Sequence, residues 1–443
     1  MTPPASSNMN TNPGIKPQHY VSAEVPGLGG VIKQRPEDFL VDEQPLYQPS
    51  GEGEHIYMLV QKKMMSTLEM IGIIAKHFGV SRKDVGFAGL KDKHAITRQV
   101  VSIYAPGKKI EDFPMLQHES LGVLWADYHN NKLRPGHLRG NRFSIRIRNV
   151  EPTKVRDALR VMNILKRTGV PNRFGEQRFG MLANNHLIGR AIICGDWDVA
   201  VRELLGPNAQ HPEFNADARR LFTEGKYREA IVAYPLQATI ETRVLNALSQ
   251  GKDARRAFQV LDETSIRFYL SAFQSAVFNA VLDDRLARNT LGTLAVGDVA
   301  IKHENGAVFA IDEPTLADPE TQPRLAAFEI SPSGPMWGTR MLQGTGECAN
   351  AERRALEAAG VTLAQLEAFD QSSRYPLEGK RRPLRVPLID PEVEGGVDEH
   401  GPYVRCAFEL PKGSFATVAM REVMKPTEGA ALADEDAEDS TGR

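Results

Sequence analysis

A strictly alternating segment, Phe143-Ser144-Ile145-Arg146-Ile147-Arg148, constrains the fold more than any other part of the sequence. Because successive side chains of a β-strand point to opposite faces of a sheet, it predicts a strand with its apolar side chains buried and both arginines on the opposite face. Residues 403–410 alternate in the same way and predict a second strand. Residues 185–290, between these strands, are mostly helical in pattern, so we expect both helices and sheet.

The length and composition suit a globular protein of two or three domains. The chain has 443 residues, 41% hydrophobic and 25% charged, which is enough to build proper cores and excludes disorder throughout. No apolar run is long enough to cross a bilayer, and the N-terminus lacks the pattern of a secretory signal, so we expect a cytoplasmic location. Cys194, Cys348 and Cys406 lie far apart without a CxxC spacing, which argues against a disulfide framework and a zinc site.

Composition and local signals also predict the tails and two helix starts. Residues 1–22 are rich in Pro, Ser, Asn and Thr, and residues 427–443 are acidic, so we expect both tails to be disordered. Ser66-Thr67-Leu68-Glu69 is a capping-box pattern, which predicts a helix from there to about Phe78. Ser414 is the predicted N-cap of a last helix.

The stretch from Gly86 to His94, GFAGLKDKH, is a candidate site of chemistry. It places one carboxylate, Asp92, among cations just after a short apolar run. Its two glycines suggest a strand that ends in a tight turn, with Asp92 at the strand end. The neighbouring cations favour the ionised carboxylate and attract an anionic partner. The alternative is a solvated Lys-Asp-Lys turn, and this stretch alone favours that alternative.

A basic segment points to a nucleic-acid partner through its charge distribution. The net charge of the chain is only −2, so such a partner cannot be inferred from the balance of charges. Between Asp127 and Glu151 there is no acidic residue, whereas basic residues and histidines are frequent. They are Lys132, Arg134, Arg139, Arg142, Arg146, Arg148, His129 and His137. We interpret the cationic face of the strand as a surface for phosphate contact, with ordinary solvated arginines as the alternative.

A dense run of Gly, aromatic and polar residues, GVPNRFGEQRFG from Gly169 to Gly180, predicts a structured loop. It could pack as a connection between domains or contact RNA directly, and the sequence leaves both interpretations open.

Together these stretches resemble the TruD family of tRNA pseudouridine synthases. The resemblance rests on seven stretches in the order of the family. They are KQRPEDFLVDE from Lys33, GEGEHIYMLVQKKMMSTLEM from Gly51, GFAGLKDKHAITRQ from Gly86, KLRPGHLRGNRFSIRIR from Lys132, GVPNRFGEQRFG from Gly169, AFQSAVFN from Ala272 and GSFATVAMRE from Gly413.

The resemblance implies an α+β fold. Its catalytic domain has a mixed, largely antiparallel sheet with flanking helices and is interrupted by an inserted α/β domain, the TRUD domain. In this chain the first part of the catalytic domain would span residues 23–168, the TRUD domain 169–379 and the C-terminal return 380–426. Two departures are notable: Arg173 stands where many members carry tyrosine, and segment 196–265 and the tails make this chain longer than compact bacterial relatives.

The resemblance also assigns roles to individual residues. Asp92 occupies the position of the catalytic carboxylate, and Lys33 that of the lysine that pairs with it. Asn141, Phe143 and Phe415 match residues that hold the target base. We expect tRNA phosphates to contact the basic segment through Lys132, Arg134, Arg139, Arg146 and Arg148.

Pseudouridine formation breaks the N-glycosidic bond of a uridine, turns the base and joins its C5 to the same ribose carbon. Because no redox change occurs, the reaction needs no cofactor, in agreement with a sequence without a phosphate loop, a dinucleotide fingerprint or a metal-ligand cluster. The implied partner is tRNA, with uridine 13 as target; neither a membrane nor an obligatory protein partner is implied.

Two other functions compete with this hypothesis. The first is an RNA-binding protein that keeps the fold without the activity, although plain binding does not require a carboxylate inside a basic cleft. The second is an aspartate-nucleophile phosphatase, which is disfavoured because His94 stands where those enzymes generally carry a second acid.

Overall fold

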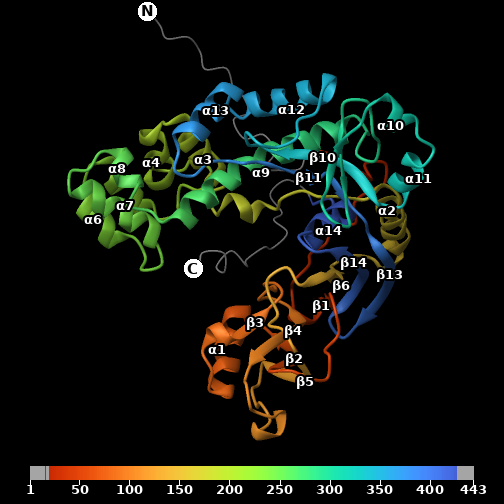
Figure 1. The fold of residues 1–443 in the computed structure, drawn as a ribbon. Coiled ribbons are helices and arrows are strands. Elements are labelled where there is room, and N and C mark those ends of the chain that lie inside the picture. Colours follow the sequence, from red (N-terminus) through yellow and green to blue (C-terminus); the bar gives the residue numbers. More distant parts are fainter. Residues whose placement is uncertain (1–14, 16–18, 427–443) are drawn as a thin grey trace, which may run out of the picture. The chain divides into compact units, whose positions relative to one another are not determined.

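The structure is a computed structural model that describes residue 15 and residues 19–426, drawn in colour in Figure 1. The chain forms two compact units. The split unit takes its described residues from two parts of the chain, 21–170 and 386–426. The inserted unit contains residues 171–385 together with residues 15, 19 and 20.

The split unit is built mainly of strands. Its elements are η1 (Pro36–Asp38), β1 (Phe39–Pro45), β2 (His55–Lys63), α1 (Thr67–Phe78), η2 (Arg82–Asp84), β3 (Val85–Phe87), β4 (Ile96–Tyr104), η3 (Ile110–Asp112), β5 (Leu121–His129), β6 (Leu138–Arg148), η4 (Pro152–Lys154), α2 (Val155–Thr168), β13 (Ile389–Asp398), β14 (Gly401–Pro411) and α14 (Ala416–Met424). The short strands β7 (Val170–Pro171) and β12 (Arg385–Val386), where the chain passes between the units, pair with each other.

The main sheet has the strand order β13-β14-β6-β1-β4-β2-β5, with β3 also paired to β4. The β1–β4 pair is parallel and the other pairs are antiparallel, so the sheet is mixed and largely antiparallel, as predicted. β1 pairs with Ile96–Arg98 of β4, and β3 pairs with Val101–Ile103. The loop of residues 88–95 therefore connects β3 to the start of β4, next to the point where β1 joins the sheet.

Helices cover the two halves of this sheet and create two cores. Apolar side chains of β1, β6 and β14 pack with those of α2 and α14, and the cluster includes Phe143, Ile145 and Ile147. Around β2, β3, β4 and β5 a second cluster forms with α1, through Met70 and Ile74. The alternating segment was thus predicted correctly for its apolar face, because burial of a strand face follows directly from the period of two.

Two predicted helix starts had different outcomes. The capping box is confirmed: Ser66 Oγ accepts a hydrogen bond from Glu69 N, and the Glu69 carboxylate accepts one from Ser66 N, at the start of α1. Ser414 as N-cap was wrong, because α14 begins at Ala416 and its N-cap position is occupied by Phe415, without a side-chain cap. The three cysteines are free thiols in the structure.

The inserted unit is mainly helical. Its elements are η5 (Glu176–Phe179), α3 (Asn185–Cys194), α4 (Trp197–Leu205), α5 (Ala216–Thr223), α6 (Tyr227–Ala233), α7 (Thr239–Ser249), α8 (Ala254–Phe258), α9 (Glu263–Ala287), β8 (Val299–Lys302), β9 (Val308–Ala310), α10 (Glu313–Ala317), α11 (Thr321–Ala326), β10 (Ile330–Met336), α12 (Gly346–Ala358), α13 (Leu363–Ser372) and β11 (Lys380–Pro383). The long helix α9 packs on α3 in the main core, and the strands form an antiparallel sheet in the order β11-β10-β8-β9.

The unit boundaries differ in detail from the predicted domain limits. Residues 380–383, which we placed in the C-terminal return, form β11 and pair with β10 of the inserted unit, a long-range pairing that composition does not reveal. Val21 N and Ser22 N donate to the carboxylate of Glu422, so these two residues belong to the split unit rather than to a tail. The rest of the predicted tails lies outside the described residues, except for Ile15, which is buried against Phe179 and Ala276, and residues 19–20.

Each helix of the described part of the chain is too short or too polar to span a lipid bilayer.

Candidate active site

Asp92 lies within the loop of residues 88–95 between β3 and β4, and this loop is held by hydrogen bonds from several elements. Gly136 N donates to Ala88 O over 2.7 Å, and Lys91 N donates to Thr67 Oγ1 at the start of α1 over 2.9 Å. Gly86, which we had assigned to turn geometry, lies instead within β3, where a Cβ would approach Leu133 O to 2.3 Å. Close packing rather than backbone freedom therefore requires glycine there.

Lys62 of β2 fixes the backbone of the same loop from inside the protein. Its side chain is fully buried, and Nζ donates to the carbonyl oxygens of Met65 (2.6 Å), Lys91 (3.3 Å) and Asp92 (2.7 Å). Removal of this ammonium would leave buried carbonyl groups without their donor. Sequence reasoning missed Lys62, because an alternating strand pattern does not tell a buried lysine from an exposed one.

A buried ion pair lies directly beside Asp92 in the sequence. Lys91 Nζ is 2.6 Å from Glu43 Oε2, and the two side chains are 4% and 1% exposed. Glu43 Oε1 also accepts a hydrogen bond from Val100 N of β4. Lys91, which we counted among cations near the carboxylate, is therefore neutralised by Glu43 and holds the loop to β1 and β4.

Lys33 and Asp92 form the ion pair that the sequence predicted as the catalytic pair. Lys33 Nζ is 3.1 Å from Asp92 Oδ1; the lysine side chain is 3% exposed and the aspartate 32% exposed. The ammonium also lies 4.8 Å from the centre of the Phe39 ring. Lys33 has φ of 59°, an unusual backbone conformation for a non-glycine residue of the kind that clusters at functional sites. The carboxylate thus faces solvent while its partner is buried.

Asn141 and Phe143 are two residues apart on β6 and so project from the same face. Asn141 stands opposite Glu43 in the register, and its Oδ1 is buried without a hydrogen-bond partner among the described residues. Phe143 is 5% exposed and its ring packs 6.4 Å from that of Phe39 and 5.8 Å from that of Phe408. Phe39, which sequence reasoning missed, therefore links Phe143 to the ammonium of Lys33.

Phe415 is half-buried at the N-cap position of α14, with Ser414 Oγ beside it in the sequence buried and without a hydrogen-bond partner in the described part of the chain.

The basic segment divides into exposed and neutralised cations. Arg134 and Arg139 are exposed, Lys132 is half-buried and donates to Lys83 O, and Arg146 is half-buried, 3.9 Å from Asp398. This arrangement leaves Arg134 and Arg139 as the most accessible cations of the predicted phosphate-binding set.

Arg148 was expected on an exposed strand face, and that expectation was wrong. It is 2% exposed, and its guanidinium pairs with Asp38 and Asp398. These two carboxylates raise the pKa of Arg148, while hydrogen bonds from Arg148 lower the pKa of Asp398 to about 2. Because η1 and the end of β13 cover this end of the strand, Arg148 ties them to the sheet and is not available to a phosphate.

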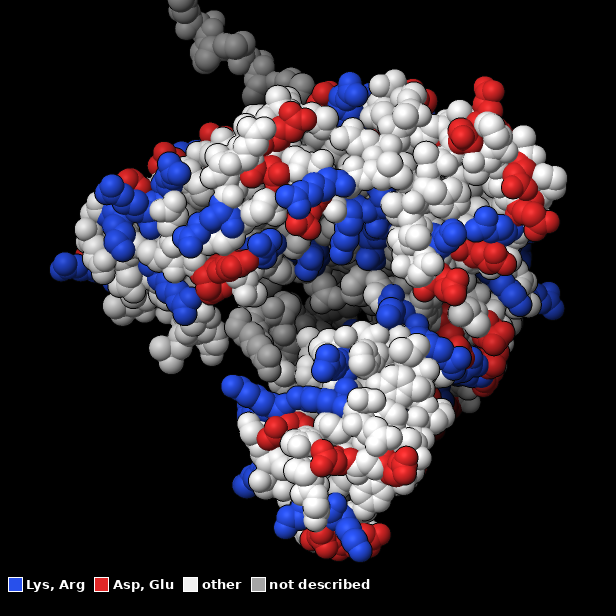
Figure 2. Space-filling model, viewed as in Figure 1, with Lys and Arg blue, Asp and Glu red and all other residues white. Residues whose placement is uncertain are grey.

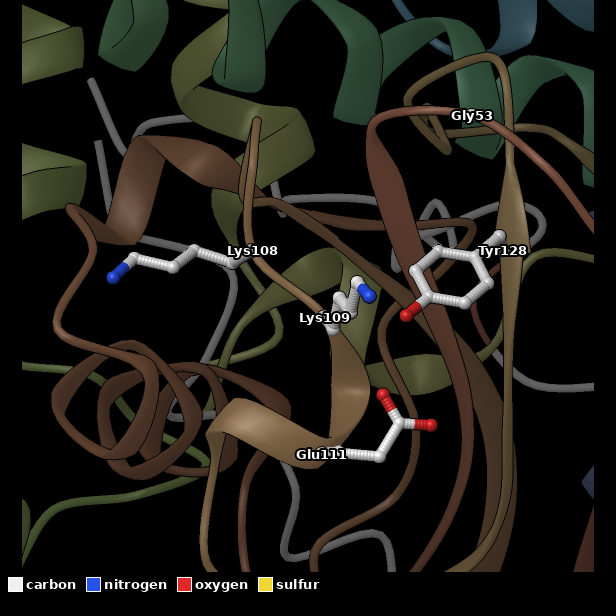
Figure 3. A pocket seen from close by; sticks show the side chains of 5 residues that line it. All are labelled: Gly53, Lys108, Lys109, Glu111 and Tyr128. Carbon is white, nitrogen blue, oxygen red and sulfur yellow. The ribbon is translucent and has the colours of Figure 1, made fainter.

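Figure 3 shows an open pocket in the split unit, lined by Gly53, Lys108, Lys109, Glu111 and Tyr128. None of the predicted site residues lines it. Lys109 and Glu111, of opposite charge, both lie at this pocket, and Tyr128 Oη accepts a hydrogen bond from Ile110 N. The pocket is therefore separate from the candidate active site.

Arg173, at the position where many TruD members carry tyrosine, is buried and forms an ion pair with Asp283 of α9. In this chain the residue fixes the loop to the helix rather than presenting a ring to a substrate.

Comparison with known proteins decides the family. The family model for tRNA pseudouridine synthase D (TruD) matches residues 16–423. The chain belongs to the TruD family. A tRNA pseudouridine synthase D of Geobacter metallireducens is 43% identical over 410 residues, which cover 92% of this chain and 98% of the relative. One from Anaeromyxobacter sp. (strain Fw109-5) is 35% identical over 419 residues, 94% of this chain and 98% of the relative.

The TruD fold is also found among solved structures. A crystal structure from Methanosarcina mazei, described as a tRNA pseudouridine synthase D, superposes with a TM-score of 0.81 at 27% identity. The match covers 94% of this chain and 98% of the other. The α+β fold expected from the resemblance is thereby confirmed.

Proposed function

We propose that this protein converts uridine 13 of tRNA to pseudouridine in the cytoplasm, with Asp92 as the catalytic carboxylate. Membership of the TruD family supports the reaction and the class of substrate. The observation that carries the role of Asp92 is its pairing with Lys33: a 32% exposed carboxylate lies 3.1 Å from a buried ammonium on an immobilised loop. The surrounding contacts hold the carboxylate in place before any substrate arrives.

Asp92 supplies the group that the isomerisation requires. Breaking the N-glycosidic bond calls for a nucleophile or base next to the ribose, and an ionised carboxylate can serve as either. As the RNA displaces water from the site, the ammonium of Lys33 remains as the charge partner of the carboxylate. C5 of the base loses its proton when it replaces nitrogen at the ribose carbon, and this proton gives the reaction a direct readout.

The target base must leave its stack to reach Asp92. Asn141, Phe143 and Phe415 are proposed to receive it. Asn141 has a buried amide oxygen without a hydrogen-bond partner among the described residues, and Phe143 is 5% exposed and mostly covered by Phe39 and Phe408. Of the basic segment we retain Lys132, Arg134, Arg139 and Arg146 as phosphate contacts and withdraw Arg148.

The test is tritium release from unmodified tRNA labelled at uridine C5. We expect Asp92→Asn to fold and bind tRNA but to release tritium about 10⁴-fold more slowly than the parent, or slower still, because the amide is neither a nucleophile nor a base. Glu52→Gln, at an exposed carboxylate of the same unit, is the matched control and should leave the rate unchanged. A tRNA with cytidine at position 13 tests the target position, since it should lose the reaction.

Two outcomes would contradict the proposal. If neither the parent nor Glu52→Gln releases tritium from tightly bound tRNA, the protein binds RNA without isomerising it. If Asp92→Asn releases tritium at the parental rate, another group performs the chemistry.

A further inference from the structure

In the inserted unit, two arginines converge on one aromatic ring. The Arg382 guanidinium carbon, from β11, lies 4.3 Å from the centre of the Phe174 ring, and that of Arg178, from η5, lies 5.9 Å from it. Figure 2 shows Lys and Arg side chains gathered over the region where Figure 1 places β11. These three residues, Arg178, Phe174 and Arg382, are called the arginine–phenylalanine cluster below.

The cluster is held rigidly by neutral groups. Asn279 of α9 accepts a hydrogen bond from Phe174 N and donates one to Phe174 O, both over 3.0 Å. Arg382 donates to Oδ1 and to the backbone oxygen of Asn172, at 2.5 and 3.4 Å, and Arg178 Nη2 donates to Ser271 Oγ over 3.0 Å. The acceptors named here are amide, carbonyl and hydroxyl oxygens, so these hydrogen bonds orient the two guanidinium groups through uncharged partners.

Three other arginines of the same unit are paired with carboxylates. Arg173 pairs with Asp283, Arg285 with Asp298, and Arg381 with Glu352. Arg178 has no carboxylate within ion-pair distance among the residues that the structure describes, and its Nε is buried there without a hydrogen-bond partner. Arg219, which is 2% exposed, likewise donates to a carbonyl oxygen, that of Gly206. Arg178 differs from it in sharing an aromatic ring with a second arginine.

The electrostatics of the cluster are unfavourable in the absence of an anion. Burial lowers the pKa of Arg178, and burial together with the charge of Arg178 lowers the pKa of Arg382 to about 10. Both shifts mean that the surroundings oppose the charged forms. Two like charges brought together at a cost to stability are typical of a site built to bind an oppositely charged group.

We propose that Arg178 and Arg382 bind a backbone phosphate of the RNA substrate, with Phe174 as the rigid support that fixes their spacing. Planar guanidinium groups match phosphate oxygens through paired hydrogen bonds, which a lysine cannot reproduce. The inference rests on the proposed function only in taking tRNA as the RNA. It assigns a role in binding to the loop for which the sequence left packing and RNA contact open.

The test is equilibrium binding of tRNA to the full chain, without turnover, over a series of salt concentrations. For Arg178→Met, which keeps the apolar stem, we expect Kd to rise about tenfold, as for a lost charge-assisted hydrogen bond. The slope of log Kd against log salt should fall by about 0.7–0.9, the value for one phosphate contact. Arg228→Met, at an exposed arginine of the same unit, removes the same charge and should leave the slope within error of the parent.

Stability separates a binding role from a packing role. The proposal expects Arg178→Met to unfold at the parental temperature or above it, because the substitution removes a buried like charge. An unchanged Kd and salt slope together with lost stability would overturn the proposal in favour of packing. If Arg178→Met does not fold, Arg178→Lys is the test variant, because it keeps the charge but not the planar guanidinium. We expect its Kd for tRNA to rise while the salt slope stays at the parental value. An unchanged Kd would overturn the proposal.

Failure of this proposal is distinguishable from failure of the proposed function. A protein that binds tRNA but releases no tritium still allows the salt series to decide the role of Arg178. Conversely, tritium release with an unaltered salt slope in Arg178→Met would preserve the isomerase and remove only the phosphate site.

Discussion

The buried lysines around Asp92 in the split unit and the arginines around Phe174 in the inserted unit have different kinds of bonding partner. Lys33 pairs with Asp92, Lys91 with Glu43, and the ammonium of Lys62 is bonded to carbonyl oxygens. Arg178 and Arg382 instead face the same ring and oppose each other's charge. The first set holds the carboxylate of Asp92 in place, whereas the second set is proposed to bind a phosphate.

Substitutions in the two regions should therefore damage different properties of the protein. Around Asp92, loss of a cation should damage catalysis or folding, because its oxygen partners remain buried without it. Around Phe174, loss of a cation should damage RNA binding and spare folding.

The largest effect in this comparison is expected from Lys33→Met. Removal of the ammonium leaves Asp92 without its charge partner when the RNA covers the site. We therefore expect tritium release to slow about 10²- to 10³-fold, which is the typical effect of losing one charge-stabilising group from an active site. Lys63→Met, at a lysine 51% exposed in the same unit, is the control and should keep the parental rate. Parental activity in Lys33→Met would show that Asp92 works without its ion pair with Lys33.

A smaller effect, on stability, is expected from two neighbouring lysines of β2. Lys62→Met leaves buried carbonyl groups without a donor and should lower the free energy of unfolding by about 2–4 kcal/mol. Lys63→Met removes only an exposed pair with Glu37 and should change it by less than about 0.5 kcal/mol. Urea denaturation of both variants measures the difference, and equal losses would mean that the ammonium of Lys62 does not support the loop.

The smallest effect concerns acid sensitivity of the inserted unit. Burial, with a contribution from Arg190, lowers the pKa of His186 to about 4, so the fold favours its neutral form. Neutral His186 contributes to the free energy of unfolding above the unfolded pKa of about 6.5, and this contribution is lost as the pH falls towards 4. The free energy of unfolding should therefore fall by about 2 kcal/mol between about pH 7.5 and 4.5. His186→Gln cannot be protonated in this range, and urea unfolding at both pH values should show a smaller loss for it than for the parent. An equal loss would assign the acid sensitivity to other groups.

Local signals predicted well those features that depend on near neighbours in the sequence. The capping box at Ser66 and Glu69 needs only four consecutive residues, and the buried face of 143–147 needs only the alternation of a strand. The seven stretches of family resemblance predicted the TruD family and its α+β fold, which the comparisons confirm. The prediction that Asp92 and Lys33 act together is consistent with their contact across 59 positions of sequence, while their catalytic role stays a prediction.

Local sequence patterns could not show which charged residues are buried. An alternating pattern assigns Arg148 to a face of the sheet but does not show that Asp38 and Asp398 cover that face. Lys62 and its exposed neighbour Lys63 look alike in the sequence, although one holds the backbone of Asp92 and the other lies at the surface. The strand β11 was placed in the wrong unit for the same reason, since its partner β10 is far away along the chain.

Periodicity, capping patterns and motifs lie in consecutive residues, so the family, the kinds of elements and the candidate carboxylate could all be predicted from them. Charge pairing depends on distances between residues far apart in the chain, so the fold was needed to show which cations are paired with carboxylates. Arg148 and Arg178 illustrate the division: both are arginines of segments for which the sequence allowed RNA contact, and only the packing around them separates a structural tie from a candidate phosphate ligand.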